Sequence, residues 1–103
     1  MITAQEIKRS LENCLRAAGI EKAVLFGSFA RGTQTRKSDI DLLIIKKTSK
    51  RFFDRYDDFK EVYKLLEDYD VEMFIYTPEE LESNENRSFI KRVFSEGIVI
   101  YGD

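Results

Sequence analysis

The sequence predicts an α/β domain in which helices pack on a small mixed β-sheet. Segments with helical periodicity alternate along the chain with short, mostly apolar runs typical of buried strands. A chain of 103 residues has room for one hydrophobic core and not for two. We therefore expect one domain over residues 1–103.

The composition excludes several kinds of chemistry. The chain has no histidine, which excludes Ser-His and Cys-His nucleophiles and imidazole-based zinc sites. Its one cysteine excludes an internal disulfide framework and favours a reducing compartment. The net charge of −2 disfavours a protein that binds nucleic acid mainly through its phosphates. No apolar run approaches the roughly 20 residues of a membrane span, and the first ten residues lack a signal-peptide pattern, so we expect a cytoplasmic protein without a membrane partner.

The first helix is predicted by a capping box, Thr3 with Glu6, followed by apolar residues at helical spacing. Gly19 is suited to end it in the left-handed conformation. Cys14 lies on the apolar stripe, which favours a small core residue over a reactive thiol. The apolar stripe consists of Ile7, Leu11, Cys14, Leu15 and Ala18.

Two strands are predicted on either side of a polar loop. Residues 23–26 form a short apolar run that ends at a glycine, and residues 28–31 can form one helical turn closed by Gly32. Residues 33–37 are polar and predict a loop. The nearly continuous aliphatic run 40–45 predicts a strand that is buried on both faces.

The second half of the chain predicts two more helical regions and two more strands. Aromatic and aliphatic residues at helical spacing from Phe52 predict an amphipathic helix ending near Asp68, and this spacing favours core packing over a cofactor stack. A strand over 71–76 precedes a helix start at Thr77 and Pro78. A last helix stops at Gly97, and residues 98–101 predict the fourth strand. The helical stripes are Phe52, Tyr56, Phe59, Tyr63 and Leu66, then Phe89, Ile90, Val93 and Phe94.

A candidate phosphate site follows the first strand, at Gly27 and Ser28. A glycine there lets the backbone approach a ligand closely. The N–H groups at a helix start, together with the Ser28 hydroxyl, suit an anion such as a phosphate. Taken alone, however, this pattern is also typical of an ordinary turn.

A candidate metal site lies at the start of the second strand. Asp39 and Asp41 are two residues apart, so in a strand both carboxylates project to the same face, with Cα atoms roughly 6.5–7 Å apart. Such carboxylates repel each other, and a divalent cation would offset this, Mg²⁺ or Mn²⁺ being favoured by oxygen ligands. The alternative is a solvated strand start in which Asp39 caps a turn. Glu72, inside the third strand, is the candidate third carboxylate, and Asp70 at the strand entry is its rival.

A basic stretch follows the second strand and is interleaved with Phe52 and Phe53. It is suited to contact RNA or an acidic partner, but a solvated linker and helix start is the favoured interpretation. The stretch consists of Lys46, Lys47, Lys50, Arg51 and Arg55.

The motif G-S-F-A-R-G, followed by S-D-I-D-L, resembles the nucleotidyltransferase signature of the DNA polymerase β superfamily. The chain is similar over nearly its whole length to the minimal nucleotidyltransferases (MNT or MntA-like antitoxins), which are often encoded beside a HEPN-domain toxin. The resemblance implies that Gly27 and Ser28 hold the triphosphate and that Asp39, Asp41 and Glu72 hold two Mg²⁺ ions, or Mn²⁺. Arg31 lies near the phosphates or is simply exposed to solvent. Glu72 departs from the aspartate that the family often carries, which puts full activity in doubt.

The resemblance implies transfer of a nucleoside monophosphate, with AMP from ATP as the expected case, to a hydroxyl on a HEPN-type partner. The chain lacks the P-loop pattern of γ-phosphate enzymes. One alternative is an antitoxin that acts by binding its partner and carries a vestigial site. The other is a transferase acting on RNA or a small molecule.

Overall fold

The chain folds around a four-stranded sheet with the strand order β3-β2-β1-β4. The computed structural model describes residues 1–102 without the side chain of Asn84, so residue 103 of the expected domain lies outside the described residues. β2 and β3 run parallel, while β1 runs antiparallel to β2 and β4. The predicted small mixed sheet is thus confirmed. The strands are β1 (Lys22–Phe26), β2 (Ile40–Ile45), β3 (Val71–Tyr76) and β4 (Ile98–Tyr101).

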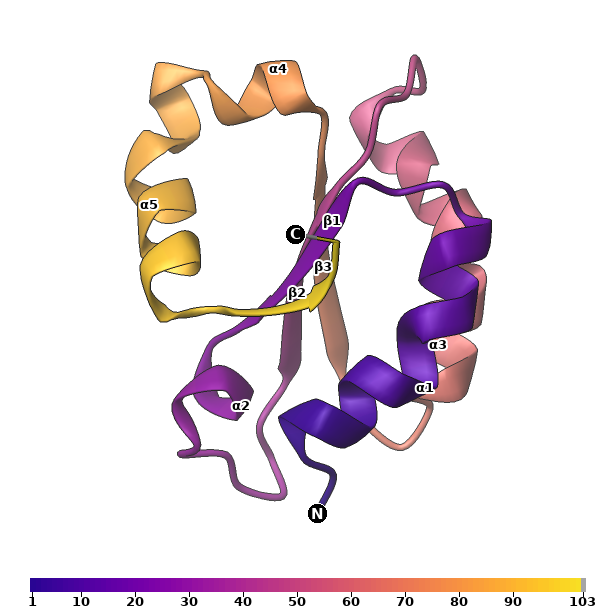
Figure 1. Cartoon of the computed structure of the whole chain (residues 1–103), viewed down its shortest axis with the longest axis vertical. Coiled ribbons are helices and arrows are strands. Elements are labelled where there is room, and N and C mark those ends of the chain that lie inside the picture. The colour runs from indigo at the N-terminus through magenta and orange to yellow at the C-terminus, as the bar shows by residue number, and fades with distance from the viewer. Residues whose placement is uncertain (103) are drawn as a thin grey trace.

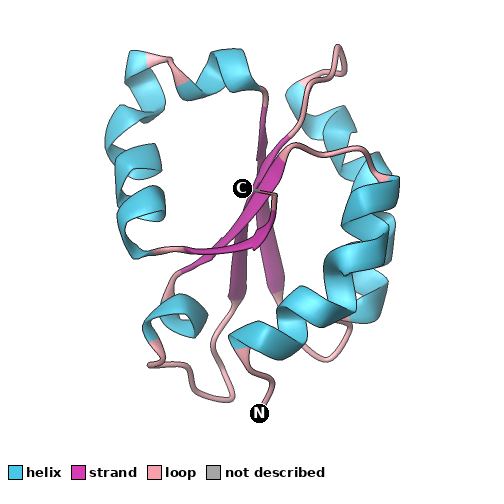
Figure 2. Cartoon of the chain, viewed as in Figure 1, coloured by secondary structure: helices cyan, strands magenta, loops and turns pink. Residues whose placement is uncertain are grey.

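Helices cover both faces of the sheet. α1 and α3 lie on one side, and α4 and α5 lie on the other (Figure 1, Figure 2). None of the helices in the described part of the chain is long and apolar enough to cross a membrane. The α-helices are α1 (Ala4–Ala17), α2 (Ser28–Arg31), α3 (Lys60–Leu65), α4 (Pro78–Leu81) and α5 (Arg87–Glu96), and the 3₁₀ segments are η1 (Phe52–Phe59) and η2 (Asn84–Asn86).

The local signals at the helix ends are confirmed. Thr3 and Glu6 form the predicted capping box at the start of α1, and Thr77 and Glu80 form the same motif at the start of α4. Gly19 follows α1 with a φ of 69°, and Gly32 closes α2 with a φ of 74°.

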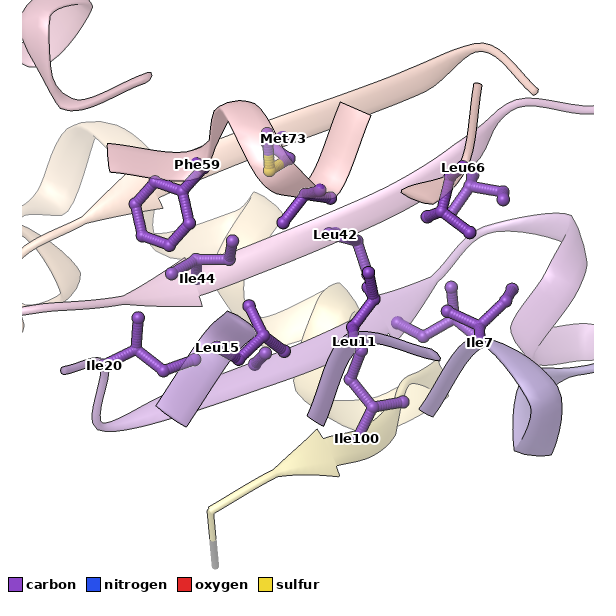
Figure 3. Close-up of a cluster of buried hydrophobic side chains, with 14 of the residues drawn as sticks. Ile7, Leu11, Leu15, Ile20, Leu42, Ile44, Phe59, Leu66, Met73 and Ile100 are labelled. Atoms are coloured by element: carbon purple, nitrogen blue, oxygen red, sulfur yellow. The ribbon is translucent and has the colours of Figure 1, made fainter. Parts of the chain in front are cut away.

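The main core lies between the sheet and the α1–α3 layer, where large aliphatic side chains interdigitate (Figure 3). Leu42 and Ile44 of β2 point into this core, whereas Leu43 points to the opposite face, where it packs with Val24 and Val93. β2 is therefore buried on both faces, as predicted. Cys14 packs against the main core and is half-buried, and burial raises the pKa of its thiol, as expected for a packing residue.

The segment after β2 differs from the predicted amphipathic helix. It begins as the 3₁₀ segment η1 and becomes α-helical only in α3, which ends at Leu65. Because a 3₁₀ turn has three residues, the buried face shifts from the predicted position Tyr63 to Val62. Tyr63 is 40% exposed, whereas Val62 is 1% exposed. The prediction that Tyr63 belongs to the core is therefore wrong, while those for Phe59 and Leu66 are confirmed.

The basic stretch is not simply a solvated linker, because Arg55 is buried. Its guanidinium donates to both carboxylate oxygens of Glu80 and to the carbonyl oxygen of Ile75. Lys46 and Lys50 both pair with Asp58. The interpretation as a solvated segment is wrong for Arg55, because a partner 25 residues further along the chain satisfies its charge inside the fold.

The end of α5 is held close to β1 by Gly97. A side chain at this position would collide with the Val24 side chain and the Val93 carbonyl. Of the predicted apolar stripe of α5, Ile90 and Val93 are buried, but Phe94 is 42% exposed. The predicted last helix ending at Gly97 is therefore confirmed, and it buries a narrower face than its apolar stripe indicates.

Candidate active site

Three carboxylates come together at one end of the sheet. Asp39, Asp41 and Glu72 each offer an oxygen that lies within 4.8 Å of the other two. The parallel register of β2 and β3 places Asp41 directly beside Glu72. Leu43 and Phe74, which follow Asp41 and Glu72 by two positions, pack on the face of the sheet that α5 covers. Because side chains alternate along a strand, Asp41 and Glu72 point to the same face. The donor set consists of carboxylate oxygens, which fits Mg²⁺ or Mn²⁺ rather than a soft metal.

Asp70, the rival of Glu72, is not part of this group. It lies just before β3, and its backbone carbonyl accepts a hydrogen bond of 2.8 Å from the N–H of Ile40. It therefore joins the two strands at their entry, an ordinary structural role.

The electrostatics of the group centre on Asp41. Burial, together with the negative charges of Glu72 and Asp39, raises the pKa of Asp41 to about 6, against an opposing effect of Arg31. A carboxylate that resists ionisation in this way gains stabilisation when a cation binds beside it. The cluster thus has the character of a cation site.

The raised pKa of Asp41 predicts a pH-dependent stability of the metal-free protein. The folded protein keeps this proton up to about pH 6, whereas the unfolded chain loses it near 3.8. The free energy of unfolding therefore falls as the pH rises through this range. Because Asp41 is only half-buried, solvent screening reduces the expected loss to about 1 kcal/mol. Urea denaturation between about pH 4 and pH 7 in the presence of a chelator measures it.

The matched variant for this measurement is Asp41→Asn, which lacks the titrating group. Asp58 and Glu80, whose pKa values are lowered by basic partners, give the opposite pH dependence, and they act in both proteins. The difference between the two proteins therefore isolates Asp41. If the variant keeps the same pH dependence, the carboxylates are not coupled as described.

The candidate phosphate turn lies against the carboxylates. Gly27 has a φ of 77°, and any side chain there would collide with the Asp41 carboxylate. α2 begins at Ser28. The N–H groups of Ala30 and Arg31 donate hydrogen bonds to the carbonyl oxygen of Gly27. Within the described part of the chain, the N–H groups of Ser28 and Phe29 have no backbone hydrogen-bond acceptor. The turn thus offers donors beside three carboxylates.

Arg31 lies at the end of α2, near enough to the cluster to influence Asp41. Its guanidinium is 3.3 Å from the carboxylate of Glu96 at the end of α5. Glu96 was not singled out in the sequence, because nothing local connects two residues that are 65 positions apart.

Two aromatic residues that lie beside the carboxylates were not predicted from the sequence. Phe26 pairs with Asp41 across β1 and β2, and Phe74 follows Glu72 by two residues on β3. Their rings are 5.9 Å apart and half-exposed, next to that of Phe89. The strand alternation was the available signal, since it places them on the face that carries the carboxylates.

Comparisons with known proteins show the family of the chain. The sequence profile of the nucleotidyltransferase domain matches residues 7–100. A Methanocaldococcus jannaschii protein named "putative protein adenylyltransferase" is 43% identical over 84 residues, which is 80% of this chain and 79% of that protein. A second protein of the same name and organism is 46% identical over 39 residues, covering 38% of this chain and 42% of its own length.

Solved structures share the fold. A toxin–antitoxin complex with AMP-PNP has a TM-score of 0.72 at 22% identity, covering 93% of this chain and 73% of that one. The MNT antitoxin in complex with tri-AMPylated HEPN toxin from Shewanella oneidensis has a TM-score of 0.64 at 18% identity, covering 96% of this chain and 72% of that one. The profile match and the 43% identity show that this chain belongs to the nucleotidyltransferase domain family and is a nucleotidyltransferase.

Proposed function

We propose that this chain transfers AMP from ATP to a hydroxyl group of a HEPN-type toxin and thereby acts as its antitoxin in the cytoplasm. The observation that carries the proposal is the cluster of Asp39, Asp41 and Glu72 directly beside the Gly27 turn. The names of the relatives support the adenylyl group, and the complex of an MNT antitoxin with an AMPylated HEPN toxin supports the partner.

The carboxylates are proposed to hold two divalent cations, Mg²⁺ or Mn²⁺. When bound, such cations polarise the phosphate and lower the pKa of an attacking hydroxyl. Asp41 lies between its neighbours, with Asp39 two positions away on the same strand and Glu72 on the adjacent one. It is therefore the residue expected to contribute to the binding of both ions. The mutual repulsion of the three carboxylates in the metal-free protein supports this assignment.

The proposed triphosphate site is the turn after β1. The N–H groups at the start of α2 and the Ser28 hydroxyl would donate to phosphate oxygens. Arg31 would add a guanidinium, which matches phosphate geometry in a bidentate manner. Because this turn lies on the β1 side of Asp41 and Glu72 lies on its β3 side, pyrophosphate would leave toward α2 and the acceptor would approach from β3.

Divalent cations are expected to stabilise the fold. A ligand that binds only the native state at a hundred times its Kd adds about 2.7 kcal/mol to the free energy of unfolding. Thermal melts with Mg²⁺ or Mn²⁺, each with and without ATP, measure the effect. Asp41→Asn should abolish it. A melting temperature that does not respond to millimolar cation under any of these conditions would contradict the proposed metal site.

Transfer to a partner is tested with a purified HEPN-type protein as the candidate acceptor. Label from α-³²P-ATP should appear on the purified partner, with pyrophosphate released, and Asp39→Asn/Asp41→Asn should not label it. Stoichiometric inhibition of the partner without ATP would instead indicate an antitoxin that acts by binding. Labelling of added RNA but not of the partner would indicate a nucleic-acid acceptor.

A further inference from the structure

The two edge strands of the sheet, β3 and β4, differ in whether side chains cover their outer backbone groups. The outer edge of β3 is covered by side chains from η1, because the Tyr56 hydroxyl donates to the Met73 carbonyl at 2.6 Å and the Arg55 guanidinium donates to the Ile75 carbonyl at 2.9 Å. These bonds occupy backbone acceptors that another strand would need. The β3 edge is therefore closed to strand pairing.

The outer edge of β4 is open. Among the described residues, no side chain is hydrogen-bonded to the backbone of this strand. Ile98 and Val99 are 39% and 38% exposed, and the exposed Phe94 lies just before them at the end of α5. An unpaired, apolar edge of this kind is a template for a further strand.

A groove runs along the same edge between β4 and α1. It has a volume of about 210 Å³ and is lined by Lys8 and Glu12 of α1 and by residues 99–102. The two charged residues are one helical turn apart and of opposite sign, and both are exposed; Glu12 also forms an exposed ion pair of 3.4 Å with Arg16 on the same helix. The groove therefore carries a charge pattern that is complementary to itself when it is rotated by a half-turn.

We propose that a second copy of this chain pairs with the β4 edge. The two β4 strands would run antiparallel about a two-fold axis and join the two sheets into one of eight strands. The same rotation brings Lys8 toward Glu12 of the partner subunit and Glu12 toward Lys8 of the partner subunit. This match of charges favours a second copy over an unrelated peptide, because binding of a peptide would not require a charge pattern that is complementary to itself.

The proposed dimer goes beyond the proposed nucleotidyl transfer and leaves it unobstructed. Glu72 lies on β3, which is the opposite edge of the sheet from β4. Each subunit would thus present its own carboxylates and phosphate turn outward, with the acceptor approaching from a side that the dimer does not cover. Activity per subunit is therefore expected to be independent of dimerisation.

Sedimentation equilibrium of the full chain tests the dimer. The average mass should rise from the 12.1 kDa of one chain toward twice that value as the concentration increases. A short edge predicts a Kd between about 10 μM and 1 mM. Val99→Lys should weaken association at least about tenfold, because like charges would face each other across the axis. Leu65→Lys, at an equally exposed apolar position on α3, should leave it unchanged.

A charge exchange makes the test specific for this geometry. Lys8→Glu should weaken association about fivefold, and the double variant Lys8→Glu/Glu12→Lys should restore it to within about twofold. All these positions are exposed, and circular dichroism is used to check that each variant is folded. A chain that stays monomeric to about 1 mM overturns the proposal, as does a dimer that Leu65→Lys disrupts or one that the double variant fails to restore.

Discussion

Glu72→Gln is expected to reduce nucleotidyl transfer by orders of magnitude. The substitution keeps the shape of the side chain but removes one of the three charges that lie within 4.8 Å of one another. The charge stabilisation that bound cations supply is worth several kcal/mol, and each 1.36 kcal/mol of lost stabilisation slows the reaction tenfold. The rate of label transfer from α-³²P-ATP to the partner, at saturating Mg²⁺, measures the effect.

The same substitution should leave the metal-free protein as stable as before, or make it more stable. Glu72 is one of the two negative charges that raise the pKa of Asp41, so its neutralisation relieves repulsion. A large loss of activity without a loss of stability therefore separates a role in the site from a role in the fold. Denaturation with urea in a chelating buffer supplies the stability measurement.

Asp70→Asn is the matched control for Glu72→Gln. Asp70 lies two positions earlier in the chain, and its contact in the sheet is made by its backbone carbonyl, which the substitution preserves. Activity should change little. The opposite ranking, with Asp70→Asn inactive and Glu72→Gln active, would transfer the assignment to Asp70. Full activity of both variants would mean that the site needs no third carboxylate from the protein.

Gly27→Ala is expected to abolish transfer by displacing Asp41. The added methyl group would collide with the Asp41 carboxylate, so that either the turn or the carboxylate must move. A displacement of about 1 Å at a reacting group can cost a hundredfold in rate. With a φ of 77° and a ψ of −153°, Gly27 lies in a region that essentially only glycine adopts, so any side chain adds strain of about 1–3 kcal/mol. Transfer rates and the thermal shift with Mg²⁺-ATP measure the two consequences.

Gly19→Ala separates strain from collision. Gly19 has a φ of 69°, close to that of Gly27, but a side chain there would meet nothing within 4 Å. Gly19→Ala should lose about 1 kcal/mol of stability through strain and keep its activity and its response to Mg²⁺-ATP. If Gly27→Ala behaves in the same way, the close approach of the turn to Asp41 has no part in the reaction.

Much of the fold could be predicted from the sequence because its signals are local. The capping boxes at Thr3 and Thr77 depend on a residue three positions away, and the turn over residues 28–31 depends on the glycines that flank it. The bounds of β2 follow from a nearly continuous aliphatic run, interrupted only by Asp41. Asp39 and Asp41 are placed together by the two-residue period of a strand alone.

The rest depended on contacts between distant parts of the chain. Val62 and Tyr63 are adjacent in the sequence, and the 3₁₀ turns of η1 before them determine which of the two side chains is buried. The burial of Arg55 requires Glu80, which a different element supplies. The sequence marks Arg55 as basic but carries no sign of its partner.

The candidate site shows the same division. The sequence by itself determined the types of its residues, the common face of Asp39 and Asp41, and the glycine that permits a close backbone approach. Only the tertiary structure decided that Glu72 lies beside Asp41, that Gly27 abuts the same carboxylate, and that Arg31 meets Glu96. These pairs depend on strand register and helix packing, and both are determined by the total apolar area that the whole core buries. That total is a property of the whole chain and cannot be derived from any single pair of residues.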